Sequence, residues 1–133
     1  MTSHWELPIA SNADVVTVRQ RVRSVSVEVG LSLIDQTKVV TAASELARNA
    51  LVYGGGGAAR IEIVQNGARQ GLTLTFSDEG PGIPDIQQAL TDGWTTGTGL
   101  GLGLGGSRRL VDEFDLISAA GKGTTVTVTK WAR

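Results

Sequence analysis

Glu45 and Asn49 are two side chains whose types and spacing could do chemistry. They are four residues apart, so they lie on the same face if this segment is helical. The amide oxygen of Asn49 could bind Mg²⁺, and the carboxylate of Glu45 could orient or deprotonate a nearby nucleophile. An arbitrary Glu-x-x-x-Asn pair is more often part of a solvated helix face, so the pair by itself leaves both interpretations open.

A glycine-rich stretch occupies residues 97–106, with the sequence Gly-Thr-Gly-Leu-Gly-Leu-Gly-Leu-Gly-Gly. Alternating glycines allow the backbone to approach phosphate groups, and a following helix directs its positive N-terminus toward the same anion. A G-x-G-x-x-G pattern is present, but it lacks the preceding strand and the βαβ unit of a dinucleotide-binding fold. No glycine loop ends in Gly-Lys-Ser/Thr, which excludes a Walker loop. The interleaved leucines argue against a solvated linker, so the stretch predicts a phosphate-binding lid.

Two turns could contribute to a nucleotide pocket. The first spans residues 77–83 and places Asp78 at the end of a strand-like segment, where a carboxylate could accept a hydrogen bond from an exocyclic amine. The glycines that follow would let a flat ring lie against the backbone. The second turn spans residues 121–125, and the hydroxyl of Thr124 or Thr125 could reach the same pocket. Each segment is also an ordinary turn, so neither is specific by itself.

Composition narrows the function classes. The chain has no cysteine, which excludes disulfides and thiolate metal sites, and its single histidine, His4, argues against a catalytic triad or a histidine-based zinc site. The net charge of −1, without a basic block, argues against a nucleic-acid partner. The N-terminal segment lacks the features of a secretory signal, and no apolar run approaches the roughly 18 residues that a bilayer span needs. We therefore expect a soluble, cytoplasmic protein with no membrane partner.

Apolar spacing predicts the elements that must position these residues. Valines at helical spacing predict a first helix from an N-cap at Asp14 to about Val29. Ser32 is expected to cap a second helix that runs to about Tyr53 and carries the Glu-x-x-x-Asn pair. Four of the 18 glycines follow at residues 54–57 and end this helix. Glycine costs backbone entropy, so such a cluster calls for a reason.

The second half of the chain alternates between apolar and polar residues, which predicts strands. A hairpin loop is expected at residues 66–71, and the final turn lies at residues 120–123. The expected strands cover residues 4–11, 60–65, 72–77, 114–119 and 124–131, and two further helices are expected, one with Pro84 and Asp85 in its first turn and one at residues 107–113. Together these predict a single domain over residues 1–133 with an α+β fold. It is a two-layer α/β sandwich in which a mixed, mainly antiparallel sheet carries helices on one face.

The order and spacing of these features are jointly more specific than any one of them. A helix with Glu-x-x-x-Asn, then Asp-x-Gly-x-Gly, a glycine-rich lid and a closing Gly-Thr resembles the GHKL ATPase superfamily, or Bergerat fold, from about residue 14 to residue 131. Within it, the Gly-Leu repeats from Gly99 and the Arg-Arg-Leu-Val-Asp-Glu-Phe segment at residues 108–114 resemble the anti-sigma-factor serine/threonine kinases. Among these, they are most similar to the RsbT-type switch kinases of the stressosome.

The resemblance implies a role for each site residue. It implies that Glu45 is the catalytic general base, Asn49 the Mg²⁺ ligand and Asp78 the group that recognises the adenine of ATP. The remaining nucleotide contacts that it implies are Gly80 and Gly82 around the base, Gly97, Thr98, Gly99, Leu100, Gly101, Leu102 and Gly103 around the phosphates, and Thr124 or Thr125 near the adenine.

One departure from relatives concerns the lid. No Lys or Arg lies between Trp94 and Leu104, although some relatives place a basic residue there to contact the γ-phosphate. That contact would have to come from Arg108, Arg109 or Lys122, or from backbone N–H groups alone.

The implied function is Mg-ATP-dependent phosphorylation of serine or threonine in small antagonist proteins with a STAS domain. Release of the kinase would then switch on a downstream phosphatase. Two alternatives remain open from the residues. One is an ATP-binding switch that sequesters a partner such as a sigma factor, as an anti-sigma factor does, with little catalysis. The other is a detached histidine-kinase ATPase module that needs a separate histidine-bearing partner.

Overall fold

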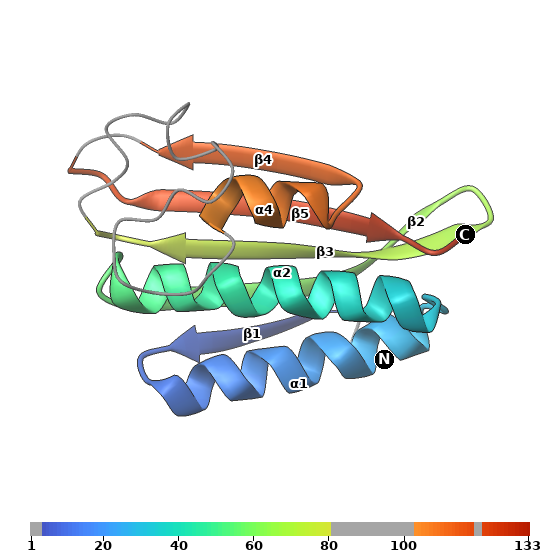
Figure 1. Cartoon of the computed structure of the whole chain (residues 1–133), viewed down its shortest axis with the longest axis horizontal. Coiled ribbons are helices and arrows are strands. Elements are labelled where there is room, and N and C mark those ends of the chain that lie inside the picture. The colour runs from blue at the N-terminus through green and yellow to red at the C-terminus, as the bar shows by residue number, and fades with distance from the viewer. Residues whose placement is uncertain (1–3, 81–102, 119–120) are drawn as a thin grey trace.

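The computed structural model describes residues 4–80, 103–118 and 121–133. In this part of the chain three helices lie on one face of a five-stranded sheet and form two layers (Figure 1). The helices are α1 (Asn12–Glu28), α2 (Leu33–Val52) and α4 (Gly103–Arg109), and the strands are β1 (His4–Ile9), β2 (Gly57–Asn66), β3 (Arg69–Asp78), β4 (Glu113–Ser118) and β5 (Thr124–Trp131). The predicted two-layer α+β sandwich is confirmed.

The sheet has the strand order β1-β2-β3-β5-β4, and each described pair of neighbouring strands is antiparallel. β2 and β3 form a hairpin in which Asn66 is paired with Arg69, so the loop contains only Gly67 and Ala68. Gly67 has a φ of 63°, which glycine adopts without the steric penalty of a side chain. The hairpin is therefore longer, and its loop shorter, than the apolar alternation predicted.

The hydrophobic core lies between the helices and one face of the sheet. Alternate side chains of β3 and β5 point toward the helices because successive residues of a strand face opposite sides. On the other side of this interface, α2 contributes a stripe of small and branched residues. The core includes Val39, Ala43, Leu46, Ala47 and Ala50 of α2 and Leu72, Leu74, Phe76, Val126 and Val128 of the sheet.

The two long helices are capped by serines. Ser32 caps α2 as predicted, and its Oγ accepts a hydrogen bond from the backbone N–H of Asp35 at 3.1 Å. The predicted cap of α1 was wrong, because Ser11 rather than Asp14 occupies that position. Ser11 Oγ accepts from the N–H of Asp14 at 3.4 Å, while Asp14 Oδ2 accepts from the N–H of Ala10 at 2.8 Å. This reciprocal arrangement puts Asp14 in the first turn of α1.

The last predicted helix also begins earlier than expected. α4 covers Gly103–Arg109 instead of residues 107–113, and β4 already starts at Glu113. The helix expected to begin with Pro84 and Asp85 lies outside the described residues. Of the helices that the structure describes, none has the length and apolar character needed to cross a membrane.

Candidate nucleotide-binding site

The C-terminal end of α2, the end of β3 and the start of β5 meet at the same end of the sandwich, at the left in Figure 1. These are the elements that carry Asn49, Asp78 and Thr124. Strand pairing places Asp78 opposite both Gly57 of β2 and Thr124 of β5. Residues far apart in the sequence are therefore brought together at this end.

Asp78 is half-buried at the last position of β3. Its Oδ1 accepts a hydrogen bond from the backbone N–H of Gly80 at 2.9 Å, which orients the carboxylate. The side chain lines a pocket of about 670 Å³ whose walls are residues 54–58 and 77–79. A carboxylate beside such a pocket can accept a hydrogen bond from the amino group of a purine, which is the role that the sequence analysis proposes for Asp78.

The turn before β5 packs against the end of β3, which carries Asp78. Gly123 has a φ of +84°, and a Cβ there would lie 2.1 Å from the backbone oxygen of Asp78. Thr124 follows immediately, and its Oγ1 lies 2.9 Å from Ser118 Oγ, with which it shares a hydrogen bond. Only glycine allows this close approach of the two backbones, so Gly123 brings Thr124 next to Asp78.

Strand alternation separates the two threonine candidates. Val126 and Val128 are buried against the helices, so Thr124 faces the same side of β5 and Thr125 faces the opposite side. On β3, Leu74 is buried against the helices. Asp78 is four positions further along the same strand, so it faces the same side as Leu74. The structure thus brings Thr124, and not Thr125, to the face that carries the other site residues.

Glu45 and Asn49 lie in the C-terminal half of α2, and both are half-buried. The buried residues Leu46, Ala47 and Ala50 of the same turns fix the orientation of this helix against the core. Both candidates therefore lie at the border of the core. An arbitrary Glu-x-x-x-Asn pair would instead lie on a fully solvated helix face.

Some of the other residues predicted to contact the nucleotide lie within the described part of the chain, and the rest lie outside it. Gly80 is described and holds the Asp78 carboxylate, and Gly103 is the first residue of α4. Arg108 and Lys122 are exposed. The contacts that lie outside the described residues are Gly82, Gly97, Thr98, Gly99, Leu100, Gly101 and Leu102.

Sequence reasoning missed the part that the glycine run after α2 plays in the pocket. It interpreted residues 54–57 only as the end of a helix, whereas these glycines form a wall of the pocket next to Asp78. The signal that could have found them is their number, since the end of a helix requires only one glycine.

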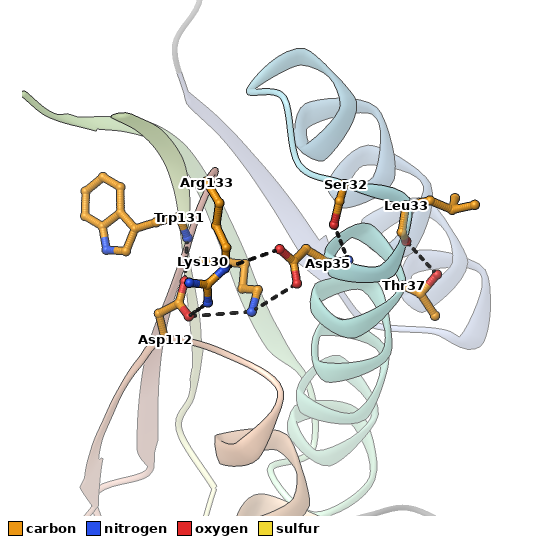
Figure 2. Close-up of polar contacts among 8 residues, drawn as sticks. All are labelled: Ser32, Leu33, Asp35, Thr37, Asp112, Lys130, Trp131 and Arg133. Atoms are coloured by element: carbon orange, nitrogen blue, oxygen red, sulfur yellow. Dashed lines mark hydrogen bonds and ion pairs between the residues drawn. The ribbon is translucent and has the colours of Figure 1, made fainter. Parts of the chain in front are cut away.

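Two charged groups lie away from this site. Lys130 at the end of β5 is buried between Asp35 of α2 and Asp112, at the opposite end of α2 from Asn49 (Figure 2). On the side of the sheet that the helices leave uncovered, Arg60 forms side-chain hydrogen bonds with Glu62 and Glu6. These bonds raise the pKa of Arg60, and the bond to Glu62 has the larger effect. Neither group contacts the pocket, so both belong to the scaffold.

Known proteins resemble this chain over most of its length. Serine/threonine-protein kinase RsbT of Bacillus subtilis (strain 168) is 46% identical over 125 residues, which cover 94% of each chain. An anti-sigma F factor of Geobacillus stearothermophilus is 34% identical over 102 residues, which cover 71% of this chain and 68% of that protein. The crystal structure of the RsbU and RsbW domains of a Mycobacterium tuberculosis protein superposes on 99% of this chain with a TM-score of 0.67 and 25% identity. The superposed part is 33% of that larger chain.

The order of motifs in the sequence predicted membership of the GHKL superfamily, and the family comparison tests this directly. The family described as histidine kinase-, DNA gyrase B- and HSP90-like ATPases matches residues 34–133, which include every predicted site residue. The protein therefore belongs to the histidine kinase-, DNA gyrase B- and HSP90-like ATPase family.

Proposed function

We propose that the protein is a Mg-ATP-dependent serine/threonine protein kinase that phosphorylates a small antagonist protein with a STAS domain. The observation that supports this most directly is the convergence of α2, β3 and β5 at one end of the sandwich. This convergence puts the helix that carries Glu45 and Asn49 at the same end as Asp78, whose carboxylate is oriented by the backbone N–H of Gly80. The similarity to a serine/threonine-protein kinase over 94% of the chain favours protein phosphorylation among the reactions of this ATPase family.

In this proposal Asp78 recognises the adenine. Its carboxylate accepts a hydrogen bond from the adenine amino group, while guanine would present a carbonyl oxygen to the same acceptor. Thr124 lies opposite Asp78 on β5, and its hydroxyl is the second group that we assign to base recognition. The two residues together select the base, and α2 contributes the groups that act at the phosphate end of ATP.

The residues present fit a magnesium ion that is bound chiefly through the nucleotide. Among residues 4–80, 103–118 and 121–133, no three His, Cys, Asp or Glu side chains form a group that could hold a metal ion. Mg²⁺ suits such a site because it keeps several waters and takes most other ligands from substrate phosphates, so the amide oxygen of Asn49 is a sufficient protein ligand. When bound, Mg²⁺ neutralises charge on the phosphates.

Glu45 acts on the attacking hydroxyl. It lies one helical turn before Asn49, so it is near the phosphates if Asn49 is at the metal. Its carboxylate accepts the proton of the substrate serine or threonine as the hydroxyl oxygen bonds to the γ-phosphorus and ADP leaves. Positioning and charge neutralisation supply most of the catalysis in phosphoryl transfer, so one such base is sufficient.

The experiment that tests the function uses ATP radiolabelled in its γ-phosphate and a purified STAS-domain antagonist protein from the same cells. We expect label to appear on a serine or threonine of the antagonist, and to be lost with the Glu45→Ala variant.

A cytoplasmic location follows from the use of ATP, and the proposed partners are the antagonist and a downstream phosphatase that the released kinase activates.

A second function has support from a specific observation, the 34% identity to an anti-sigma F factor. In that case the protein would bind ATP and sequester a sigma factor with little catalysis. The same experiment separates the two, because a stable complex with a sigma factor and no label transfer would favour sequestration.

A further inference from the structure

The glycine run at residues 54–57 has more glycines than the end of a helix needs. Its first member, Gly54, is tied to the last turn of α2, because its N–H donates a hydrogen bond to the backbone oxygen of Asn49 at 3.2 Å. The same run lines the pocket beside Asp78. Gly54 is thus in direct contact with the two segments that carry the proposed metal-binding and base-binding residues.

The contact between Gly54 and Asp78 leaves no room for a side chain. A Cβ on Gly54 would lie 2.3 Å from Cγ of Asp78, 2.6 Å from its Cβ and 2.6 Å from Oδ2. All three of these neighbours belong to the Asp78 side chain. The backbone of Gly54 therefore forms a wall against one side of the carboxylate, and any larger residue would displace that carboxylate.

Gly80 contacts both the Asp78 carboxylate and Gly54. Its N–H donates to Asp78 Oδ1 at 2.9 Å, and a Cβ on Gly80 would lie 2.6 Å from Cα of Gly54. The carboxylate is consequently fixed by a hydrogen bond to Oδ1 and by van der Waals contact at Cγ and Oδ2. Neither glycine has a φ in the left-handed region, so close packing and not backbone conformation explains why these positions are glycine.

We propose that Gly54 is a positioning residue that sets the orientation of the Asp78 carboxylate and thereby the preference for adenine over guanine. The inference rests on the proposed role of Asp78 in base recognition and extends it to the segment after α2. Gly54 influences base recognition through the Asp78 side chain, against which it packs.

The test compares ATP and GTP binding by calorimetry, in the presence of Mg²⁺, for the full chain and its Gly54→Ala variant. A carboxylate moved out of place leaves the adenine amino group unpaired, which lowers affinity about ten- to a hundredfold. We expect Gly54→Ala to lower ATP affinity by at least about tenfold while GTP affinity changes little, so that the ratio of the two falls. A purely structural role would lower both affinities equally and leave the ratio unchanged, which would overturn the proposal.

A second variant covers the case in which Gly54→Ala does not fold. Because the three atoms nearest to the new methyl group all belong to the Asp78 side chain, Asp78→Gly should accommodate it. The double variant Gly54→Ala/Asp78→Gly should fold and bind ATP as Asp78→Gly does. If the double variant also fails to fold, or binds ATP much more weakly than Asp78→Gly, Gly54 does not act through Asp78.

The matched control is Gly67→Ala in the loop between β2 and β3. A Cβ there meets nothing within 4 Å, and its φ of 63° makes the substitution mildly destabilising without any contact to the pocket. Its ratio of ATP to GTP affinity should equal that of the wild-type protein. If the wild-type protein itself binds GTP as well as ATP, the role of Asp78 is wrong. Kinase activity is not involved in this measurement, so a failure of the proposed phosphorylation is detected separately.

Discussion

Replacing Lys130 with methionine should destabilise the protein more than any exposed charge substitution. Lys130 Nζ lies 3.5 Å from Asp35 Oδ1 and 3.5 Å from Asp112 Oδ1 (Figure 2). The lysine side chain is 4% exposed, and those of Asp35 and Asp112 are 11% and 23% exposed. Lys130→Met preserves most of the side-chain volume, so the lost charge and not a cavity determines the effect.

The magnitude follows from the groups left behind. Removing one partner of a buried ion pair costs about 3–5 kcal/mol, because the other charge stays buried without compensation. Arg133 remains within 3.7 Å of Asp35 and 3.3 Å of Asp112, but its side chain is 68% exposed and compensates weakly. We therefore expect the lower end of this range, about 3 kcal/mol. For a domain of this size that corresponds to a decrease of about 10 °C in Tm.

Urea unfolding followed by far-UV circular dichroism at neutral pH measures this free energy. The matched control is Arg60→Met, which removes a cation whose ion pair with Glu6 is short, 2.7 Å, but exposed. Exposed pairs contribute little to stability, so this variant should unfold at nearly the same urea concentration as the wild-type protein. Equal midpoints for Lys130→Met and Arg60→Met would refute the reasoning, since burial would then have no effect on the cost of losing the charge.

Three further predictions concern the nucleotide site. Asn49→Ala should weaken Mg-ATP binding severely in calorimetry while the melting temperature stays close to that of the wild type; unchanged affinity would remove Asn49 from the metal site. Asp78→Asn should lose the preference for ATP over GTP by about ten- to a hundredfold in competition with a labelled nucleotide. Glu45→Ala should keep ATP affinity but reduce label transfer to the antagonist by at least about tenfold, and full transfer would contradict a general base at this position.

The sequence alone predicted the features that depend on local order. Valine spacing located α1, the serine at position 32 located the start of α2, and apolar alternation located the strands. The order of the Glu-x-x-x-Asn, Asp-x-Gly-x-Gly and glycine-rich motifs was sufficient to predict the ATPase family, because each motif is a short contiguous segment. The predicted start of α1 was less accurate, because Ser11 and Asp14 both bond backbone N–H groups there and only Asp14 was expected as the cap.

Other features depended on which segments the tertiary structure brings together. Thr124 and Thr125 are adjacent and chemically identical, and only the burial of one face of β5 shows which of them is beside Asp78. Gly54 is indistinguishable from its neighbours in the sequence until the end of β3 packs against it. Lys130 continues an alternating strand, yet it is buried because Asp35 and Asp112, which are distant in sequence, supply its counter-charges. In each case the position or burial of the residue depends on contacts between helices and strands. These contacts are set by which side of the sheet the helices cover, and the local sequence pattern does not contain that information.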